Sequence, residues 1–212
     1  MTMVEIIASI NAITFEEIKE RIKKIEAYVS WCHLDVTDGI FSKHITWNNP
    51  TDLALLDTKL NVEVHLMVEE PEKKIDQWLI NPIKRVIVHL EVSKDIDFVI
   101  DRCKQADIEC GLAICPDTSW DLFIPWAQKI NFIEILAVNP GPSGQIMNAE
   151  IVDKIVHLRK SFPSCIIEVD GGITPETART ARKAGANILV SAAYIFSHAD
   201  IPKAIQDLAQ EL

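Results

Sequence analysis

The chain has 212 residues, a formal net charge of −10 and 48% hydrophobic residues. This length suits one domain with a substantial core, and we expect that domain to span residues 1–212. The acidic balance argues against a nucleic acid or an anionic membrane as partner, because a phosphate surface needs a basic face. No apolar run is long enough to cross a membrane, and five cysteines without a Cys-x-x-Cys pair are typical of reduced thiols in a cytoplasmic protein.

Short apolar runs alternate with amphipathic stretches through the first half of the chain. The predicted strands are 5–10, the stretch from residue 31 to the turn signal Asp38-Gly39, 60–67 and 85–89. Helices are predicted after Thr14, whose spacing to Glu17 fits a capping box, after Pro71, and around Ile96 to Cys103.

The second half repeats this alternation. Further strands are predicted at 110–114, 132–138, 165–169 and 187–190. A short amphipathic segment follows Pro116, and helices are predicted around 151–158, after Thr174-Pro175 and around 201–208. Eight apolar strands, each followed by a helical segment, indicate a parallel sheet covered by helices. In this length they favour a closed (β/α)₈ barrel, of the α/β class, over an open doubly wound sheet, which would be expected to carry a glycine-rich fingerprint after its first strand.

The second predicted strand gives the first indication of chemistry. Alternate side chains share a face of a strand, so His33 and Asp35 point the same way. An imidazole and a carboxylate placed in this way can share a metal ion. A buried histidine held in one tautomer by its neighbour is the alternative, and a lone pair of this kind favours that structural role.

Polar side chains recur at the same end of other predicted strands, where barrels place their chemistry. The residues that meet there are Ser9, His33, Asp35, His65, His89 and Asp170. Two histidines and two carboxylates, His33, His65, Asp35 and Asp170, make a nitrogen and oxygen site suited to one divalent ion: zinc, iron, manganese or cobalt. We assign His89 a supporting or structural role, because nothing in the sequence pairs it with the other four.

Glycines mark the ends of the sixth and seventh strands. Gly141 and Gly144 follow one strand, and Gly171-Gly172 follow the next. Glycine lets the backbone present N–H groups to an anion, and barrels commonly hold a substrate phosphate at their last strands. This location modestly favours a phosphate site over ordinary turns.

Five segments together resemble the ribulose-phosphate 3-epimerase family. They are Ala8-Ser9-Ile10, His33 to Gly39, Val64 to Val68, Val138 to Gln145, and Val169 to Ile173. The resemblance implies a metal-dependent barrel enzyme, an isomerase of the pentose phosphate pathway. It would interconvert ribulose 5-phosphate and xylulose 5-phosphate through an enediolate. His33, Asp35, His65 and Asp170 would bind the metal.

By the same resemblance, Asp35 and Asp170 would be the catalytic acid/base pair. Removing a proton on one face of a carbon and returning one on the other requires two such groups. The substrate-binding residues would be Ser9, His65, Met67, Gly141, Gly144, Gly171, Gly172, Ala192 and Ala193. The expected partners are a small phosphorylated sugar and further copies of the chain in a homo-oligomer.

Several segments depart from the family pattern, among them the loop after the eighth predicted strand. Ala192-Ala193 stands where the family typically has Gly-Ser, so a serine hydroxyl is missing beside the expected phosphate. This difference leaves two alternatives open: an epimerase or lyase acting on another ketose phosphate, such as a hexulose phosphate, or a non-catalytic barrel that binds sugar phosphates.

Overall fold

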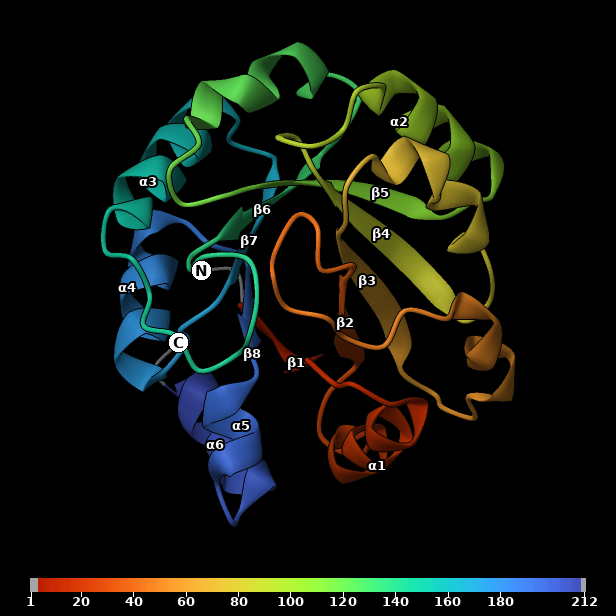
Figure 1. Cartoon of the computed structure of the whole chain (residues 1–212). Helices are drawn as coiled ribbons and strands as arrows, with labels where there is room; N and C mark the ends of the chain where they lie inside the picture. The colour runs from red at the N-terminus through yellow and green to blue at the C-terminus, as the bar shows by residue number, and fades with distance from the viewer. Residues whose placement is uncertain (1–3, 211–212) are drawn as a thin grey trace.

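Eight parallel strands close into a barrel with helices around it, in a computed structural model that describes residues 4–210 (Figure 1). Each strand pairs with the next in the chain, and the last pairs with the first. The strands are β1 Glu5–Ile10, β2 Trp31–Thr37, β3 Asn61–Met67, β4 Ile83–His89, β5 Glu109–Ile114, β6 Phe132–Leu136, β7 Ile166–Asp170 and β8 Ile188–Ser191. The predicted barrel is confirmed, whereas the domain bounds 1–212 stay a prediction.

Among the described residues, the outer layer combines six α-helices with 3₁₀ segments. The α-helices are α1 Phe15–Ile25, α2 Ile96–Gln105, α3 Ile151–Ser161, α4 Pro175–Ala184, α5 Ala193–Ser197 and α6 Ile201–Gln210. The 3₁₀ segments are η1 Pro50–Leu55, η2 Pro71–Lys73, η3 Ile75–Gln77 and η4 Trp120–Trp126. Thr14 caps α1 by accepting from the Glu17 N–H, as its spacing predicts. Within the described residues, none of the helices is long and apolar enough to span a membrane.

Two elements differ from the sequence-based expectation. The segment after Pro71 forms the short turns η2 and η3 rather than an α-helix. Pro82 disfavours helical backbone at Asn81, so a helix after Pro71 could not continue to β4, and the chain turns there instead. Strand β6 stops at Leu136, two residues early, because the Ala137 carbonyl accepts from the Asn148 N–H of the returning loop.

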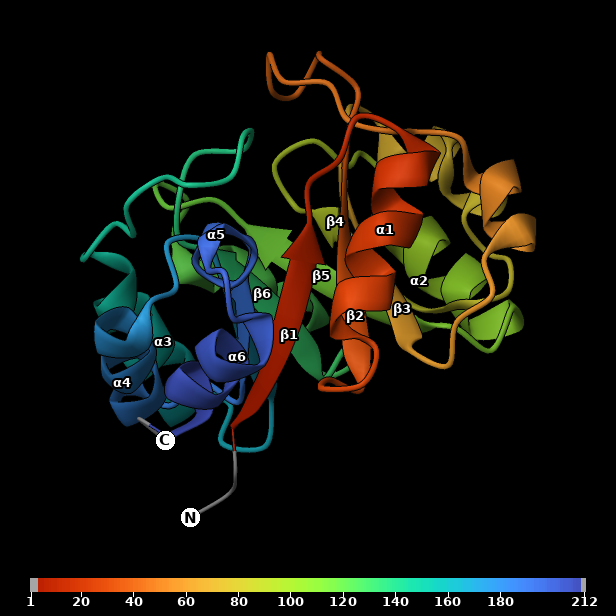
Figure 2. The same cartoon turned by 90° about the horizontal axis from the view of Figure 1, so that it is seen from below.

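Strand register brings the polar side chains together at one end of the barrel. Asp35 of β2 lies beside His65 of β3, and His33 lies beside Ser9 of β1. Asp170 ends β7. The loops that follow β2 and β6 extend from the same end of the barrel, beyond the arrowhead of β1 (Figure 2). The predicted metal ligands therefore all lie at or near this end of the barrel.

A charged layer lies beneath the rim among otherwise apolar strands. Glu63, Glu134 and Glu168 have no exposed surface, and Arg85 is also buried. Arg85 donates to Glu63 and lies between the Trp31 and Phe132 rings, 4.5 and 4.0 Å from their centroids. Buried charges of this kind need partners, so the layer constrains the groups above it.

Candidate metal and sugar-phosphate site

His33, Asp35, His65 and Asp170 form a compact buried cluster at the rim. Each offers one ligand atom, and the four atoms lie within 4.8 Å of one another. Asp35 Oδ1 lies 3.3 Å from His33 Nε2 and 3.6 Å from His65 Nδ1. Asp170 Oδ2 lies 3.8 Å from His65 Nδ1 and 4.0 Å from His33 Nε2. Ligands bound at about 2.0–2.2 Å from one ion are separated by roughly these distances.

The atoms that face one another in this cluster lack hydrogen bonds. His33 Nε2, Asp35 Oδ1 and His65 Nδ1 are buried, and none has a hydrogen-bond partner among the described residues. Leaving buried polar atoms unpaired costs free energy, and a cation between them would satisfy all three at once. The residues present therefore fit a divalent metal.

Charge in the cluster leads to the same conclusion. Burial by itself disfavours the charged imidazole, yet the nearby Asp35 and Glu63 carboxylates raise the pKa of His33 well above its usual value. For His65, burial is likewise outweighed by the Glu134 charge and by Asp170 and Asp35, which raise its pKa to about 9. Burial would raise the pKa of Asp35, but the two histidines hold it far below its usual range. The surroundings thus favour positive charge at the centre of the cluster.

The remaining oxygen of Asp35 is held by polar side chains. Its Oδ2 accepts from Ser9 Oγ at 2.9 Å and from Asn11 Nδ2 at 3.2 Å. Asn11 also donates to the Gly141 carbonyl, and its Oδ1 lies 2.9 Å from His44 Nε2. Sequence reasoning placed Ser9 here but missed Asn11 and His44, which lie in loops without a strand pattern.

The outward nitrogens of the two histidines also have partners. His33 Nδ1 lies 2.9 Å from Glu63 Oε1. His65 Nε2 lies 2.8 Å from His89 Nε2 and 3.1 Å from Glu134 Oε1. Such contacts fix the tautomer of a ligand histidine. Sequence reasoning missed Glu63 and Glu134, although an acidic residue within an apolar strand was an available signal.

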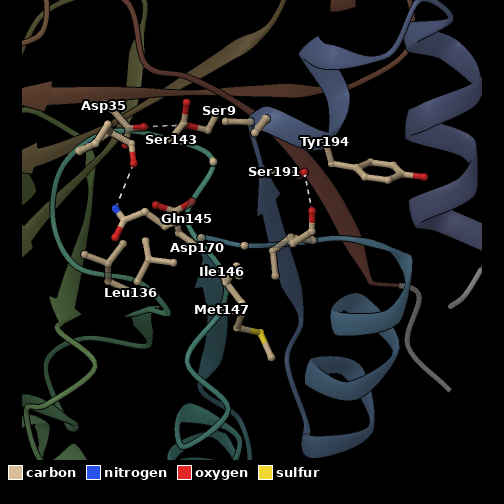
Figure 3. Close-up of a pocket in the computed structure, with 18 of the residues that line it drawn as sticks. Ser9, Asp35, Leu136, Ser143, Gln145, Ile146, Met147, Asp170, Ser191 and Tyr194 are labelled. Atoms are coloured by element: carbon tan, nitrogen blue, oxygen red, sulfur yellow. Dashed lines mark hydrogen bonds between the residues drawn. The ribbon is translucent and has the colours of Figure 1, made fainter.

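A cavity of about 410 Å³ opens above the cluster. Asp35 and Asp170 line it, whereas His33 and His65 do not. Figure 3 shows the bond from Ser9 to Asp35 in one part of the cavity and the bond from Ser191 to the Ile173 carbonyl in another. The other predicted substrate residues that line it are Met67, Gly141, Gly144, Gly171, Gly172, Ala192 and Ala193. His65 alone of the predicted substrate set lies beneath the cavity.

Glycine is structurally required at the end of β7. Gly172 has φ +65°, and a Cβ built there would lie 2.3 Å from the Met147 backbone nitrogen. Ala192 differs, because its φ of −107° is one that any residue adopts. The glycine typical of the family is therefore not needed at position 192, and the missing hydroxyl at Ala193 is the consequential difference. A Cβ at Gly144 would lie 3.8 Å from the Ala193 Cβ, so these loops meet.

Comparison with known proteins identifies relatives along the whole barrel. The profile of the Ribulose-phosphate 3 epimerase family matches residues 5–196. A ribulose-phosphate 3-epimerase from Chlamydia pneumoniae is 35% identical over 82% of this chain and 80% of its own length. One from Schizosaccharomyces pombe is 30% identical over 97% of this chain and 92% of its own length.

Solved structures share the fold at lower identity. KGPDC from Streptococcus mutans superposes with a TM-score of 0.77 at 8% identity, covering 99% of this chain and 97% of that one. A 3-hexulose-6-phosphate synthase gives 0.73 at 16% identity, covering 99% and 100%. These structures support the barrel alone. The family match and the curated relatives carry more: this chain belongs to the ribulose-phosphate 3-epimerase family.

Proposed function

We propose that the chain is a metal-dependent ketose-phosphate 3-epimerase that interconverts ribulose 5-phosphate and xylulose 5-phosphate. The observation that carries this proposal is the placement of Asp35 and Asp170, which extend from β2 and β7 into one cavity. Inversion at a carbon next to a ketone requires proton removal on one face and delivery on the other. A pair of carboxylates on one cavity supplies both groups. The curated relatives carry the name of this activity.

Asp35 is equipped to act as one of the two acid/base groups. Its pKa is held low, so it is ionised near neutral pH and can accept a proton. Ser9 and Asn11 donate to Oδ2 and orient the carboxylate toward the cavity. Asp170 would serve the opposite face of the substrate carbon. In the reverse reaction the two residues exchange roles.

His33, His65, Asp35 and Asp170 would hold one divalent ion, zinc, iron, manganese or cobalt. When bound, such an ion supplies Lewis-acid stabilisation of negative charge developing on the substrate oxygens. The protein's part is to keep His33 Nε2 and His65 Nδ1 unprotonated and aimed inward, through Glu63 and His89 behind them.

The phosphate would lie among backbone N–H groups near Gly144, Gly172, Ala192 and Ala193, which line the far part of the cavity. Main-chain N–H groups in glycine turns form anion-binding concavities. Met67 would cover the sugar. The cavity of about 410 Å³ falls in the usual size range of small-molecule sites.

The reaction can be tested in heavy water. Incubation with ribulose 5-phosphate should incorporate deuterium at C3 and yield xylulose 5-phosphate. Asp35→Asn and Asp170→Asn should each lower turnover by about 10²–10⁴-fold or more, because one face loses its acid/base group. The matched control is Asp153→Asn on the surface of α3, which should keep wild-type turnover.

The same assay separates the alternatives. Turnover of hexulose phosphates without turnover of ribulose 5-phosphate would replace the proposed substrate with the hexulose alternative. Absence of proton exchange on any ketose phosphate, with tight sugar-phosphate binding, would identify a non-catalytic binding barrel instead.

The proposed function also implies a metabolic pathway and a cellular location. We place the enzyme in the pentose phosphate pathway of the cytoplasm, which is supported by five free cysteines and by a rice relative named as a cytoplasmic isoform. A relative in Arabidopsis thaliana is named as chloroplastic, so location varies among relatives. The homo-oligomer remains part of the proposal, and light scattering after size exclusion tests it.

A further inference from the structure

Three further ligand-type side chains converge at the ends of β4 and β5, outside the inner cluster of His33, Asp35, His65 and Asp170. They are His89, Glu91 and Cys115, whose ligand atoms all lie within 4.8 Å of one another. His89 Nδ1 lies 3.1 Å from Glu91 Oε2 and 3.6 Å from Cys115 Sγ. We refer to these three residues as the outer cluster.

The donor set of the outer cluster has a clear preference. Imidazole, carboxylate and thiolate together suit zinc and softer divalent ions more than magnesium or calcium. Around a tetrahedral zinc, a sulfur at about 2.3 Å and a nitrogen at about 2.0–2.1 Å are separated by roughly 3.6 Å, and a nitrogen and an oxygen by roughly 3.4 Å. The observed separations of 3.6 and 3.1 Å are close to both.

The cation beside the outer cluster, Lys154, interacts electrostatically with Glu91 and Cys115 but makes its hydrogen bonds elsewhere. Lys154 donates its ammonium group to the backbone carbonyls of Cys115, Pro116 and Thr118, rather than to Glu91. The Phe41 ring packs on the His89 ring at 4.7 Å. Burial and the Glu91 charge raise the pKa of the Cys115 thiol. A divalent ion would offset the carboxylate charge and hold the thiol as thiolate.

We propose that His89, Glu91 and Cys115 bind a second divalent cation of the zinc and cadmium class, and that this outer cation opposes cation binding at the inner cluster. The outer site itself does not depend on the proposed function. The antagonism between the two sites does rest on the proposed function, because the inner cluster has to bind a metal for the antagonism to exist.

The antagonism follows from one proton between two imidazoles. His65 Nε2 and His89 Nε2 face each other at 2.8 Å, so one of them must donate and the other accept. A cation on His65 Nδ1 requires the proton on His65 Nε2, and His89 then accepts it and carries its own proton on Nδ1. A cation on His89 Nδ1 requires the proton on His89 Nε2, and His65 Nδ1 then carries a proton toward the inner cluster. With both cations bound, two N–H groups would point at each other.

The outer site can be tested with Co²⁺, which gives a near-ultraviolet charge-transfer band when a thiolate binds it. Co²⁺ added to the metal-free protein should produce this band. Cys115→Ser should abolish it, while the matched control Cys165→Ser, which alters the residue just before β7 begins, should keep it. Glu91→Ala should weaken outer binding about tenfold or more and keep the band at saturation. Absence of the band at saturating Co²⁺ in Asp170→Asn, whose weakened inner cluster cannot oppose outer binding, would overturn the proposal.

The antagonism has its own measurement. In Asp170→Asn, whose inner cluster lacks a ligand, the band should appear at Co²⁺ concentrations about tenfold lower than in the wild type. Cadmium should displace a cation from the inner cluster of the wild type but not of Cys115→Ser, as measured by equilibrium dialysis. Simultaneous filling of both sites without mutual weakening would overturn the antagonism. Neither readout needs catalytic turnover, so a failure of the proposed function would be seen separately.

Discussion

The inner cluster and the glycine turns that face it across the cavity are built in opposite ways. The inner cluster consists of side chains, fixed by paired strands and by contacts such as His33 to Glu63. The proposed phosphate region consists of backbone, shaped by Gly172 at φ +65° and by the loops that follow β6 and β8. Side-chain sites depend on residue identity, whereas backbone sites depend on conformation. Substitutions should therefore abolish function on one side and tune it on the other.

The largest effect is expected at the inner cluster. His65→Ala should lower the affinity for a divalent ion by about 100-fold or more, because one of the four ligands is lost. Isothermal titration calorimetry with zinc or manganese measures this. His157→Ala, on an exposed face of α3, is the matched control. Unchanged metal affinity in His65→Ala, with a native circular dichroism spectrum, would contradict the assignment of the ligand.

A gain of function is expected in the phosphate region. Ala193→Ser would add a hydroxyl donor where the loops meet at Gly144. A well-formed bond to a charged phosphate contributes about 1.5–3 kcal/mol, which corresponds to a KM roughly one to two orders of magnitude lower. Steady-state kinetics with ribulose 5-phosphate measure it. Ala192→Gly is the control and should bring no gain, because φ at Ala192 is already negative. An unchanged KM in Ala193→Ser would show that this loop does not contact the phosphate.

The steric contact at Gly172 can be tested separately from the strain of a positive φ. Gly172→Ala should destabilise the protein by about 1–3 kcal/mol, because it combines a left-handed backbone with a collision at the Met147 backbone. Gly144→Ala shares a positive φ but meets no atom closer than 3.8 Å, so its cost should be smaller. Urea unfolding of both variants compares the two. Equal destabilisation would mean that the close approach to Met147 does not matter.

The smallest effect concerns Asp38, which directly follows β2 and binds the segment after β3. It accepts from Lys74 Nζ at 2.7 Å and from the backbone N–H groups of Ile40, Glu69 and Phe41. Burial would raise the pKa of Asp38, but these bonds lower it below its usual value. A carboxyl group with a lowered folded-state pKa stabilises the protein above its unfolded pKa, about 3.9, and loses that contribution as pH falls through the folded value.

Asp38→Asn should therefore cost about 1 kcal/mol at pH 7 and less at pH 3. Urea unfolding at the two pH values, with Asp57→Asn as the surface control, measures the difference. A cost that grows as pH falls would reverse the sign and refute this account.

The sequence was sufficient for the barrel and for the rim residues that have a strand pattern. His33, Asp35, His65 and Asp170 occupy alternating positions at the ends of apolar strands, and strand pairing brings them together. Asn11 was not predictable, because its contacts reach Asp35 of β2 and Gly141 of the loop after β6, 24 and 130 residues away in the chain. Such contacts depend on loop paths that local patterns do not encode.

The buried acids show a different limit. Glu134 and Glu168 lie in strands whose other residues are apolar, and periodicity alone assigned them no role. Their environment sets their protonation: burial raises the pKa of Glu134 to about 7, and burial with the Glu63 and Glu134 charges raises the pKa of Glu168 well above its usual value. A pattern shows that a strand is buried, but only the packed barrel shows which buried charges meet.

Asn11 links the Asp35 carboxylate to the loop after β6. Its side-chain amide bonds both Asp35 and the Gly141 carbonyl of the loop after β6, and His44 holds its oxygen. An outward movement of that loop would break the bond to Gly141. Asn11 would then be restrained by fewer contacts, and the Asp35 carboxylate would lose part of its orientation. On the proposed function, the orientation of this acid/base group therefore depends on the position of the loop.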